Sequence, residues 1–261
     1  MGDGVYETIR MAGGHPFRFA DHLARLKNSL VALEIPEPLY LLDLEHIIMD
    51  VARANHAQAG LARITITRGV SVDLYHPVES LPTVLVHLRP LPQLSPEERS
   101  LGARVTIVSR VRNMTGSTDP SIKTTSYLNS IQARREAESH GCREGLMLNH
   151  AGHVAEGASS SIFWVRNGEL RTPSLEVGIL PGITRQHTLL DARAAGIPTR
   201  EGSWGPDDLL GAEEAFLTSS AVGILPIGWI DDTRKEPGAV TSALRARFGH
   251  SLAALEAPQS P

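Results

Sequence analysis

The sequence of 261 residues has the composition of an ordinary globular protein, with 41% hydrophobic and 21% charged residues. Its formal net charge of −4 gives no long-range attraction to nucleic acid or to an acidic membrane surface. No apolar run is long enough to span a bilayer, and the first residues lack the features of a signal peptide. The single cysteine, Cys142, cannot form an intrachain disulfide. We therefore expect a cytoplasmic protein without nucleic-acid or membrane partners.

The first part of the chain predicts strands and two helices. Residues 4–11 alternate as a strand does, and a turn at 13–14 leads into a predicted hairpin with residues 15–19. An amphipathic helix is predicted over 22–34, with Asp21 as its N-cap, and a second helix over 41–57. Three stretches rich in β-branched residues predict strands at 61–69, 83–91 and 103–112.

The second part of the chain predicts a further set of strands and helices. Residues 111–122 lack periodicity and predict a connector, which precedes a helix over 125–141. Hairpin strands are predicted at 144–149, 153–157, 160–165 and 169–173, the last two joined by a type I′ turn at Asn167–Gly168. A helix over 181–196 and a strand–loop–strand unit over 213–230 follow. We predict an α+β fold of two lobes, 1–110 and 123–261, joined by the linker 111–122.

Lys123 is the candidate reactive amine, because the chain has only three lysines. Lys27 lies beside the apolar stripe of a predicted helix, and Lys235 lies in a predicted charged turn. A phosphate-binding loop of the form G-x-x-x-x-G-K-[ST] is disfavoured, because Ile122 precedes Lys123 where that loop needs glycine. The sequence also lacks H-E-x-x-H, C-x-x-C and G-x-S-x-G, so we predict no metal site and no nucleophile-elbow serine.

Pyridoxal phosphate would give Lys123 a partner, since this cofactor needs an amine, an anion near its ring nitrogen and donors for its phosphate. Glu156 ends a predicted strand and is followed by small residues that admit a flat ring. Residues 180–185 open a predicted helix, and the N–H groups at a helix start attract phosphate. Residues 217–223 add hydroxyls and backbone amides, and Arg25 can form a bidentate contact.

The stretches GDGVYETIR, DHLARL, ITRG, IKTTSYLNS, EGLMLN, VAEGASSSIF, ILPGITR and EAFLTSSA occur in this order between residue 2 and about residue 227. In them the chain resembles the class IV, or fold-type IV, pyridoxal-phosphate enzymes: branched-chain and D-amino acid aminotransferases and aminodeoxychorismate lyases. The resemblance implies a small α/β N-terminal lobe, a larger C-terminal pseudo-barrel lobe, pyridoxal 5′-phosphate as cofactor and a homodimer. We expect the partner subunit to cover apolar stretches such as 222–230. The chain departs from the family at Ser161, where Asn is frequent, and we expect the small lobe to lack the family's first strands.

The resemblance also implies a role for each matching position. Lys123 would form the Schiff base and move the proton between the substrate Cα and the cofactor C4′, and Glu156 would pair with the pyridine nitrogen. Tyr127, expected one helical turn beyond the lysine, would bind near the phenolic oxygen, and Leu180 would pack on the ring. The phosphate would be held by Arg25, the amides of Ile183 and Thr184, and the loop of Ser219 and Ser220. The remaining cofactor-binding positions are Ser159, Ser160 and Gly182.

The substrate pocket is expected along one face of the first strand, where alternation places Tyr6, Thr8 and Arg10 together. Arg63 or Arg68 and the loop 70–76 complete the expected pocket, although Asp73 stands where D-amino acid aminotransferases tend to have arginine. The predicted reaction is transamination between an amino acid and a 2-oxo acid, with the amino donor and its chirality open. Aminodeoxychorismate lysis to 4-aminobenzoate and pyruvate is the alternative, and a non-catalytic binding protein for the cofactor is a third hypothesis.

Overall fold

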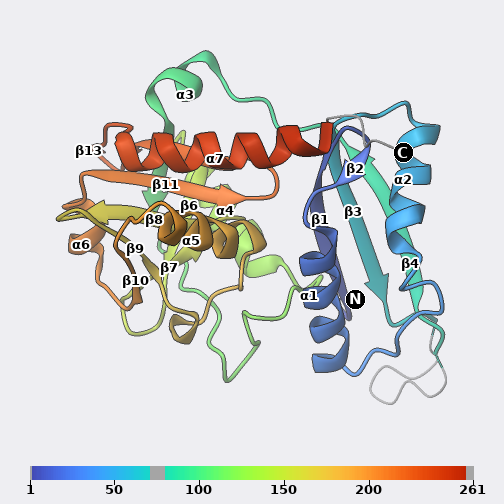
Figure 1. Ribbon diagram of the computed structural model, residues 1–261. Coiled ribbons are helices and arrows are strands. Elements are labelled where there is room, and N and C mark those ends of the chain that lie inside the picture. Colours follow the sequence, from blue (N-terminus) through green and yellow to red (C-terminus); the bar gives the residue numbers. More distant parts are fainter. Residues whose placement is uncertain (1, 71–79, 257–261) are drawn as a thin grey trace. The chain divides into compact units, whose positions relative to one another are not determined.

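The computed structural model describes residues 2–70 and 80–256, which form two compact units (Figure 1). Within the described residues, unit 1 comprises 2–70, 80–91, 122–127 and 251–256, and unit 2 comprises 92–121 and 128–250. These boundaries differ from the predicted lobes 1–110 and 123–261. Residues 92–110 group with unit 2 because β5 (Ala103–Ile107) pairs with strands of that unit, and Lys123 groups with unit 1 because its segment pairs with β1.

Unit 1 contains a four-stranded antiparallel sheet with two helices on it. The strands are β1 (Gly4–Ala12), β2 (His15–Pro16), β3 (Gly60–Thr67) and β4 (Thr83–Arg89), in the order β2-β1-β3-β4. The helices are α1 (Phe19–Ala32) and α2 (Leu44–Ala54). Helix α1 begins three residues before its predicted start, and Arg18 rather than Asp21 precedes its first turn. Because Arg18 adopts a positive φ of 56°, the chain turns sharply enough to begin the helix there.

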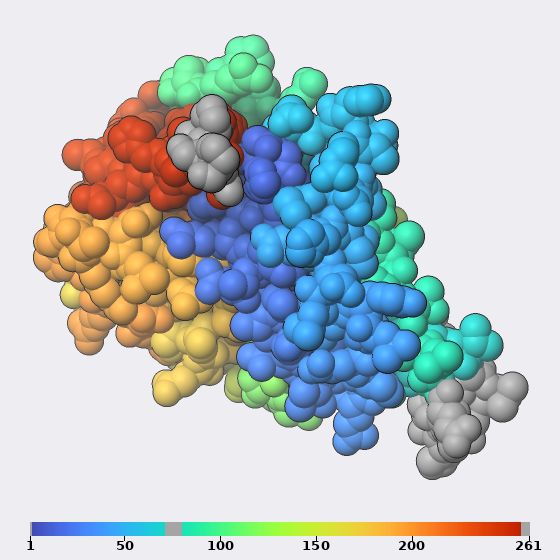
Figure 2. Space-filling model, turned by 45° about the vertical axis from the view of Figure 1, so that its right-hand side comes forward, coloured from blue at the N-terminus to red at the C-terminus, as the bar shows by residue number. Residues whose placement is uncertain are grey.

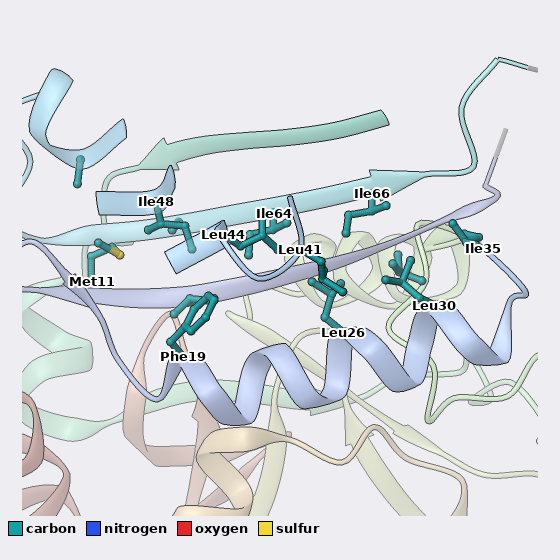
Figure 3. Close-up of a cluster of buried hydrophobic side chains, with 14 residues drawn as sticks. Met11, Phe19, Leu26, Leu30, Ile35, Leu41, Leu44, Ile48, Ile64 and Ile66 are labelled. Carbon is teal, nitrogen blue, oxygen red and sulfur yellow. The ribbon is translucent and has the colours of Figure 1, made fainter. Parts of the chain in front are cut away.

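The core of unit 1 lies between the sheet and both helices. Figure 3 shows Phe19, Leu26 and Leu30 of α1 directed toward the strands, against residues such as Ile64 and Ile66 of β3. Each such fully buried aliphatic side chain contributes about 1.5–3 kcal/mol. From β1, Val5, Ile9 and Met11 face this core. Strand alternation puts Glu7 in the same row, where an apolar residue is the norm.

Unit 2 is built on one mixed sheet in the order β10-β9-β8-β11-β12-β5-β6-β7, with β13 paired to β12. Besides β5, its strands are β6 (Glu144–Leu148), β7 (Val154–Gly157), β8 (Ser161–Arg166), β9 (Glu169–Pro173), β10 (Thr199–Gly202), β11 (Glu214–Ser219), β12 (Gly223–Ile230) and β13 (Thr233–Arg234). Its helical segments are α3 (Pro96–Leu101), α4 (Leu128–Ser139), η1 (Leu175–Val177), α5 (Ile183–Ala194), α6 (Pro206–Leu210) and α7 (Ala239–Glu256), whose last six residues belong to unit 1. The predicted turn at Asn167–Gly168 is present, both residues having positive φ.

The two largest clusters of buried apolar side chains in the described part of unit 2 both involve its strands. One gathers Ile162, Trp164, Leu217 and Leu225, with other residues of the same strands. The other gathers Phe163 and Phe216, whose rings stack 5.1 Å apart, with apolar residues of α5 and α7. Strand β12 is buried within this unit along nearly all of its length. The predicted α+β class is confirmed. The expectation that the apolar stretch 222–230 needs cover from a partner subunit is wrong, because the unit covers it.

Two features of unit 2 escaped the sequence analysis. Helix α7 was not predicted, and its residues show no strong amphipathic pattern. Lys235, in the predicted charged turn, is 4% exposed, and its Nζ donates to the carbonyls of Leu210 and Ala212, at 2.5 and 2.8 Å. Burial lowers the pKa of Lys235. The two hydrogen bonds satisfy carbonyls at the C-terminal end of α6, so Lys235 acts as a C-terminal cap of that helix.

Candidate active site

The segment that carries Lys123 is fixed to the free edge of β1. The Tyr6 N–H donates to the Lys123 carbonyl at 3.0 Å, and the Thr125 N–H donates to the Gly4 carbonyl at 2.8 Å. The hydroxyls of Thr124 and Thr125 add further bonds to carbonyls of residues 2 and 4. This extended pairing corrects the prediction that Tyr127 lies one helical turn beyond Lys123, because α4 begins only at residue 128. Tyr127 is brought near by the edge pairing instead.

The ring of Tyr6 is the meeting point of several predicted site residues in unit 1. The Lys123 Nζ lies 4.5 Å from the ring centroid, and the Arg63 guanidinium carbon lies 3.8 Å from it. Tyr127 meets the same ring edge-on at 5.8 Å. Burial and the neighbouring Tyr127 raise the pKa of Tyr6 well above its usual value, so its phenol stays neutral. Two cations beside a neutral ring favour a bound anion, such as a substrate carboxylate.

Arg25 lies in a buried polar cluster on the other face of β1. Its Nε and Nη2 donate to the two carboxylate oxygens of Glu7, both at 2.8 Å, and His22 Nδ1 lies 2.7 Å from Glu7 Oε2. Burial acts to raise the pKa of Glu7, but Arg25 and His22 outweigh it and hold that pKa far below its usual range. The bidentate partner of Arg25 within unit 1 is thus a carboxylate that the sequence analysis did not consider.

The other predicted substrate residues of unit 1 have mixed surroundings. Thr8 and Arg10 are half-buried on the same face of β1 as Tyr6, and burial lowers the pKa of Arg10 although Glu256 opposes this. Arg68 donates to the Asp3 carboxylate and to the carbonyls of residues 33 and 34 beyond α1. These contacts are structural, so Arg63 is the better candidate of the two. Residues 71–76 of the predicted loop, including Asp73, lie outside the described residues.

In unit 2, Glu156 occupies β7 with its side chain 7% exposed. Its carboxylate accepts from the Leu180 N–H at 3.2 Å and from Arg112 Nε at 2.7 Å. Arg112 was missed because it lies in the predicted connector, 44 residues before its partner. The backbone N–H of Arg112 donates to the Leu148 carbonyl, which holds the connector beside β6. A buried carboxylate fixed by two donors is suited to holding a ring nitrogen in its protonated form.

The serines after β7 bind a different group from the one expected. The hydroxyls of Ser159 and Ser160 donate to Glu144 Oε2 at 2.9 and 3.0 Å. Glu144 is buried, and Arg134 lies 3.8 Å from its other oxygen. The side chains of Ser159 and Ser160 therefore stabilise this turn through Glu144. The predicted contact of these two serines with a cofactor stays a prediction.

The predicted phosphate donors of unit 2 converge at the start of α5. No side chain caps this helix at Gly182, so the first-turn N–H groups, including those of Ile183 and Thr184, have no partner from the cap. A Cβ on Gly182 would lie 2.8 Å from the Ser161 hydroxyl, and Ser161 pairs in register with Thr218 of β11. The hydroxyl of Thr218 is buried without a hydrogen-bond partner in the described part of the chain. This donor set fits a phosphate ester, with the half-buried Ser219 and Ser220 following Thr218.

Residues 2–70 and 80–256 contain neither a metal-binding cluster nor a membrane-spanning helix. Within them, no group of three or more His, Cys, Asp or Glu side chains is arranged to hold a metal ion. No helix in the same ranges has the length and apolar character needed to cross a membrane.

Comparison with known proteins matches residues 4–230 to the family model of class IV aminotransferases. A Methanocaldococcus jannaschii protein assigned to the branched-chain-amino-acid aminotransferases is 34% identical over 95% of this chain and 86% of its own. The aminodeoxychorismate lyase of Bacillus subtilis is 32% identical over 95% of this chain and 86% of its own. The branched-chain amino acid aminotransferase of Thermobaculum terrenum, crystallised in its pyridoxal-phosphate form, superposes with a TM-score of 0.87 and is 28% identical, covering 96% and 85% of the two chains.

Proposed function

Since the chain belongs to the class IV aminotransferase family, we propose that it transfers an amino group from an amino acid to a 2-oxo acid, with Lys123 as the amine that binds pyridoxal 5′-phosphate. The predicted family and cofactor are confirmed at the level of the family. The observation that carries the proposal is the position of Lys123 on the edge of β1, with its Nζ against the ring of Tyr6. When bound, the cofactor supplies an electron sink that makes the substrate Cα–H acidic.

Residues of this chain hold the cofactor and transfer the proton in the proposed reaction. Lys123 would hold the cofactor through its amine, and the same amine, when free, would carry the proton removed from the substrate Cα. Tyr6 lies beside the amine as a neutral phenol, so it leaves proton transfer to the lysine. Glu156, oriented by Arg112 and the Leu180 N–H, holds the proton on the ring nitrogen.

The cofactor phosphate and the substrate carboxylate bind to separate sets of residues. Arg25, the amides of Ile183 and Thr184, and the loop of Ser219 and Ser220 bind the phosphate. Arg63 binds a substrate carboxylate beside Tyr6, while Thr8 and Arg10 line the same face of β1. Leu180, Gly182, Ser159 and Ser160 border the cofactor.

Lysis of aminodeoxychorismate is the second candidate, because a Bacillus subtilis relative of that name is 32% identical to this chain. Both reactions start with removal of the Cα proton by Lys123. They differ in the next step, which in transamination places the proton on C4′ and in lysis expels a leaving group from the substrate. Transamination is favoured because the family model and the M. jannaschii relative are both aminotransferases.

A half-reaction decides between the two activities. The purified protein, loaded with pyridoxal 5′-phosphate, is mixed with a panel of L- and D-amino acids without any oxo acid, and its absorbance spectrum is followed. Transamination predicts conversion of the lysine-bound band to that of pyridoxamine 5′-phosphate by some amino acids. Lys123→Ala should lose the borohydride-reducible band and slow turnover at least about a thousandfold, because the proton carrier is gone.

Lys27→Ala is the matched control, since it removes a half-buried lysine of α1 that has no proposed role. If no amino acid converts the band, but aminodeoxychorismate yields pyruvate and 4-aminobenzoate, the protein is the lyase. A reducible band that survives in Lys123→Ala contradicts both activities as proposed here.

We further propose that unit 1 is the small lobe and unit 2 the large, cofactor-binding lobe. The protein is proposed to act as a cytoplasmic homodimer. The single cysteine supports a reducing compartment, and exposed apolar side chains of unit 1 support a dimer: Val31, Leu39, Tyr40 and Leu42 are each more than 60% exposed.

A further inference from the structure

Glu7 is a charged residue in a row of β1 that otherwise faces an apolar core. Its neighbours in that row, Val5 and Ile9, are fully buried, and Glu7 itself has 0% exposure. A buried carboxylate is tolerated only when donors satisfy it. Two residues of α1, Arg25 and His22, provide those donors. An aliphatic residue at position 7 would pack against the core without the free-energy cost of burying a charge. We therefore interpret Glu7 as a residue that holds the side chain of Arg25.

The contact between Glu7 and Arg25 fixes the orientation of the guanidinium. Nε and Nη2 each donate to a different carboxylate oxygen at 2.8 Å, which is the planar fork-to-fork arrangement. Because both carboxylate oxygens of Glu7 accept a hydrogen bond from Arg25, any rotation of the guanidinium would break at least one of these two hydrogen bonds. His22, bonded to Glu7 Oε2 at 2.7 Å, restrains the carboxylate in turn.

The same helix joins this cluster to Lys123. Ser29 lies four residues after Arg25, so the two side chains leave α1 on one face. The Lys123 N–H donates to the Ser29 hydroxyl at 3.3 Å, and Ser29 is buried. Within unit 1, the guanidinium held by Glu7 and the backbone of Lys123 are thus one helical turn apart along α1. Helix α1 therefore contacts both the carboxylate that orients Arg25 and the backbone of the residue whose amine is proposed to bind the cofactor.

From this arrangement we propose that Glu7 is a positioning residue that aims the Arg25 guanidinium at the cofactor phosphate. The proposal rests on the proposed function, in which Arg25 binds that phosphate. A Glu7 that only stabilised unit 1 would affect folding but not the preference for a phosphorylated ligand. This difference gives the test a readout that is independent of turnover.

The test compares binding of pyridoxal 5′-phosphate with binding of pyridoxal, which lacks the phosphate, to the cofactor-free protein. The readout is the ratio of the two dissociation constants, measured by absorbance titration. Glu7→Gln should reduce the preference for the phosphorylated form about tenfold, because the Arg25 guanidinium would no longer be oriented for its charge-assisted contact with the phosphate. The dissociation constant of pyridoxal should not change. Arg25→Gln should give a loss of the same kind, and the double variant should lose no more than Arg25→Gln alone.

Asp50→Asn is the matched control, because it breaks an exposed carboxylate–arginine pair with Arg53 in the same unit. If Glu7→Gln melts at a lower temperature but keeps the wild-type ratio, Glu7 is a structural partner and the proposal is wrong. If Glu7→Gln does not fold, Glu7→Asp replaces it with the same two outcomes, since it keeps the charge but withdraws it by one methylene. A wild-type protein without any preference for the phosphorylated form would contradict the proposed function itself.

Discussion

At the residue scale, the candidate reactive groups are easier to find in the sequence than the residues that contact them. Lys123 and Glu156 stand out because few other lysines compete and because small residues follow the glutamate. Arg112 and Glu7 were missed, since each acts on a partner 44 or 18 positions away in the sequence. Glu7 carried a signal that could have been used: a carboxylate in the apolar row of an alternating strand needs a buried cation.

The role of Glu156 predicts a separation between cofactor binding and turnover. Glu156→Gln keeps the shape of the side chain but removes the charge that holds the ring nitrogen protonated. We expect the variant to retain the cofactor and to lose about a hundredfold in kcat, because the electron sink is weakened. Spectroscopic cofactor content and steady-state kinetics measure the two quantities on the same preparation.

Glu98→Gln is the matched control for this variant. It changes a carboxylate of unit 2 that also pairs with an arginine, Arg143, but that has no proposed role in the site. Its kcat should equal that of the wild type. Wild-type turnover in Glu156→Gln would show that another group faces the ring nitrogen.

At the element scale, β12 depends on a glycine that its sequence does not mark. Gly228 lies where the register of β12 against β5 shifts, between Ile227 and Trp229. A Cβ on Gly228 would come within 2.2 Å of the Leu101 carbonyl oxygen, which is backbone and cannot rotate away. The glycine therefore permits close approach of the turn after α3 to the strand.

Gly228→Ala is expected to destabilise unit 2 by about 2 kcal/mol, because the strand must move away from that carbonyl. Urea unfolding followed by circular dichroism measures the change in the free energy of unfolding. Gly249→Ala is the control: Gly249 lies in α7 with nothing within 4 Å of an added Cβ, so alanine should stabilise by about 0.8–1 kcal/mol. Equal stability of Gly228→Ala and the wild type would mean that the strand accommodates a side chain there.

At the scale of the whole molecule, the exposed apolar surface lies elsewhere than the sequence suggested. The apolar stretch of β12 is covered within unit 2, whereas the segment before α2 exposes Leu39, Tyr40 and Leu42. Figure 2 shows the light-blue surface formed by this segment and by α2. Exposed apolar side chains close together in the chain are typical of a surface that a partner covers.

The homodimer proposal predicts a particle of twice the chain mass of 28.2 kDa in light scattering. Leu39→Glu places a charge on a side chain that is 90% exposed, so it should leave folding intact but favour the monomer. Leu175→Glu, on a half-exposed leucine of unit 2, should remain dimeric. A fully active wild-type monomer would contradict the proposal.

The sequence by itself determined the α+β class and the family, and it singled out Lys123 as the candidate amine, because alternation, turn residues and short motifs are local patterns. It also determined most strands, since β-branched runs between turns leave few other structures. Only the tertiary structure decided which unit contains Lys123, that Tyr127 meets the ring of Tyr6, and that Glu7 and Arg112 contact Arg25 and Glu156. The physical reason is that these arrangements depend on pairing between distant segments. The edge of β1 captures residues 123–125, and the energy of a buried ion pair depends on distance in space rather than on separation along the chain.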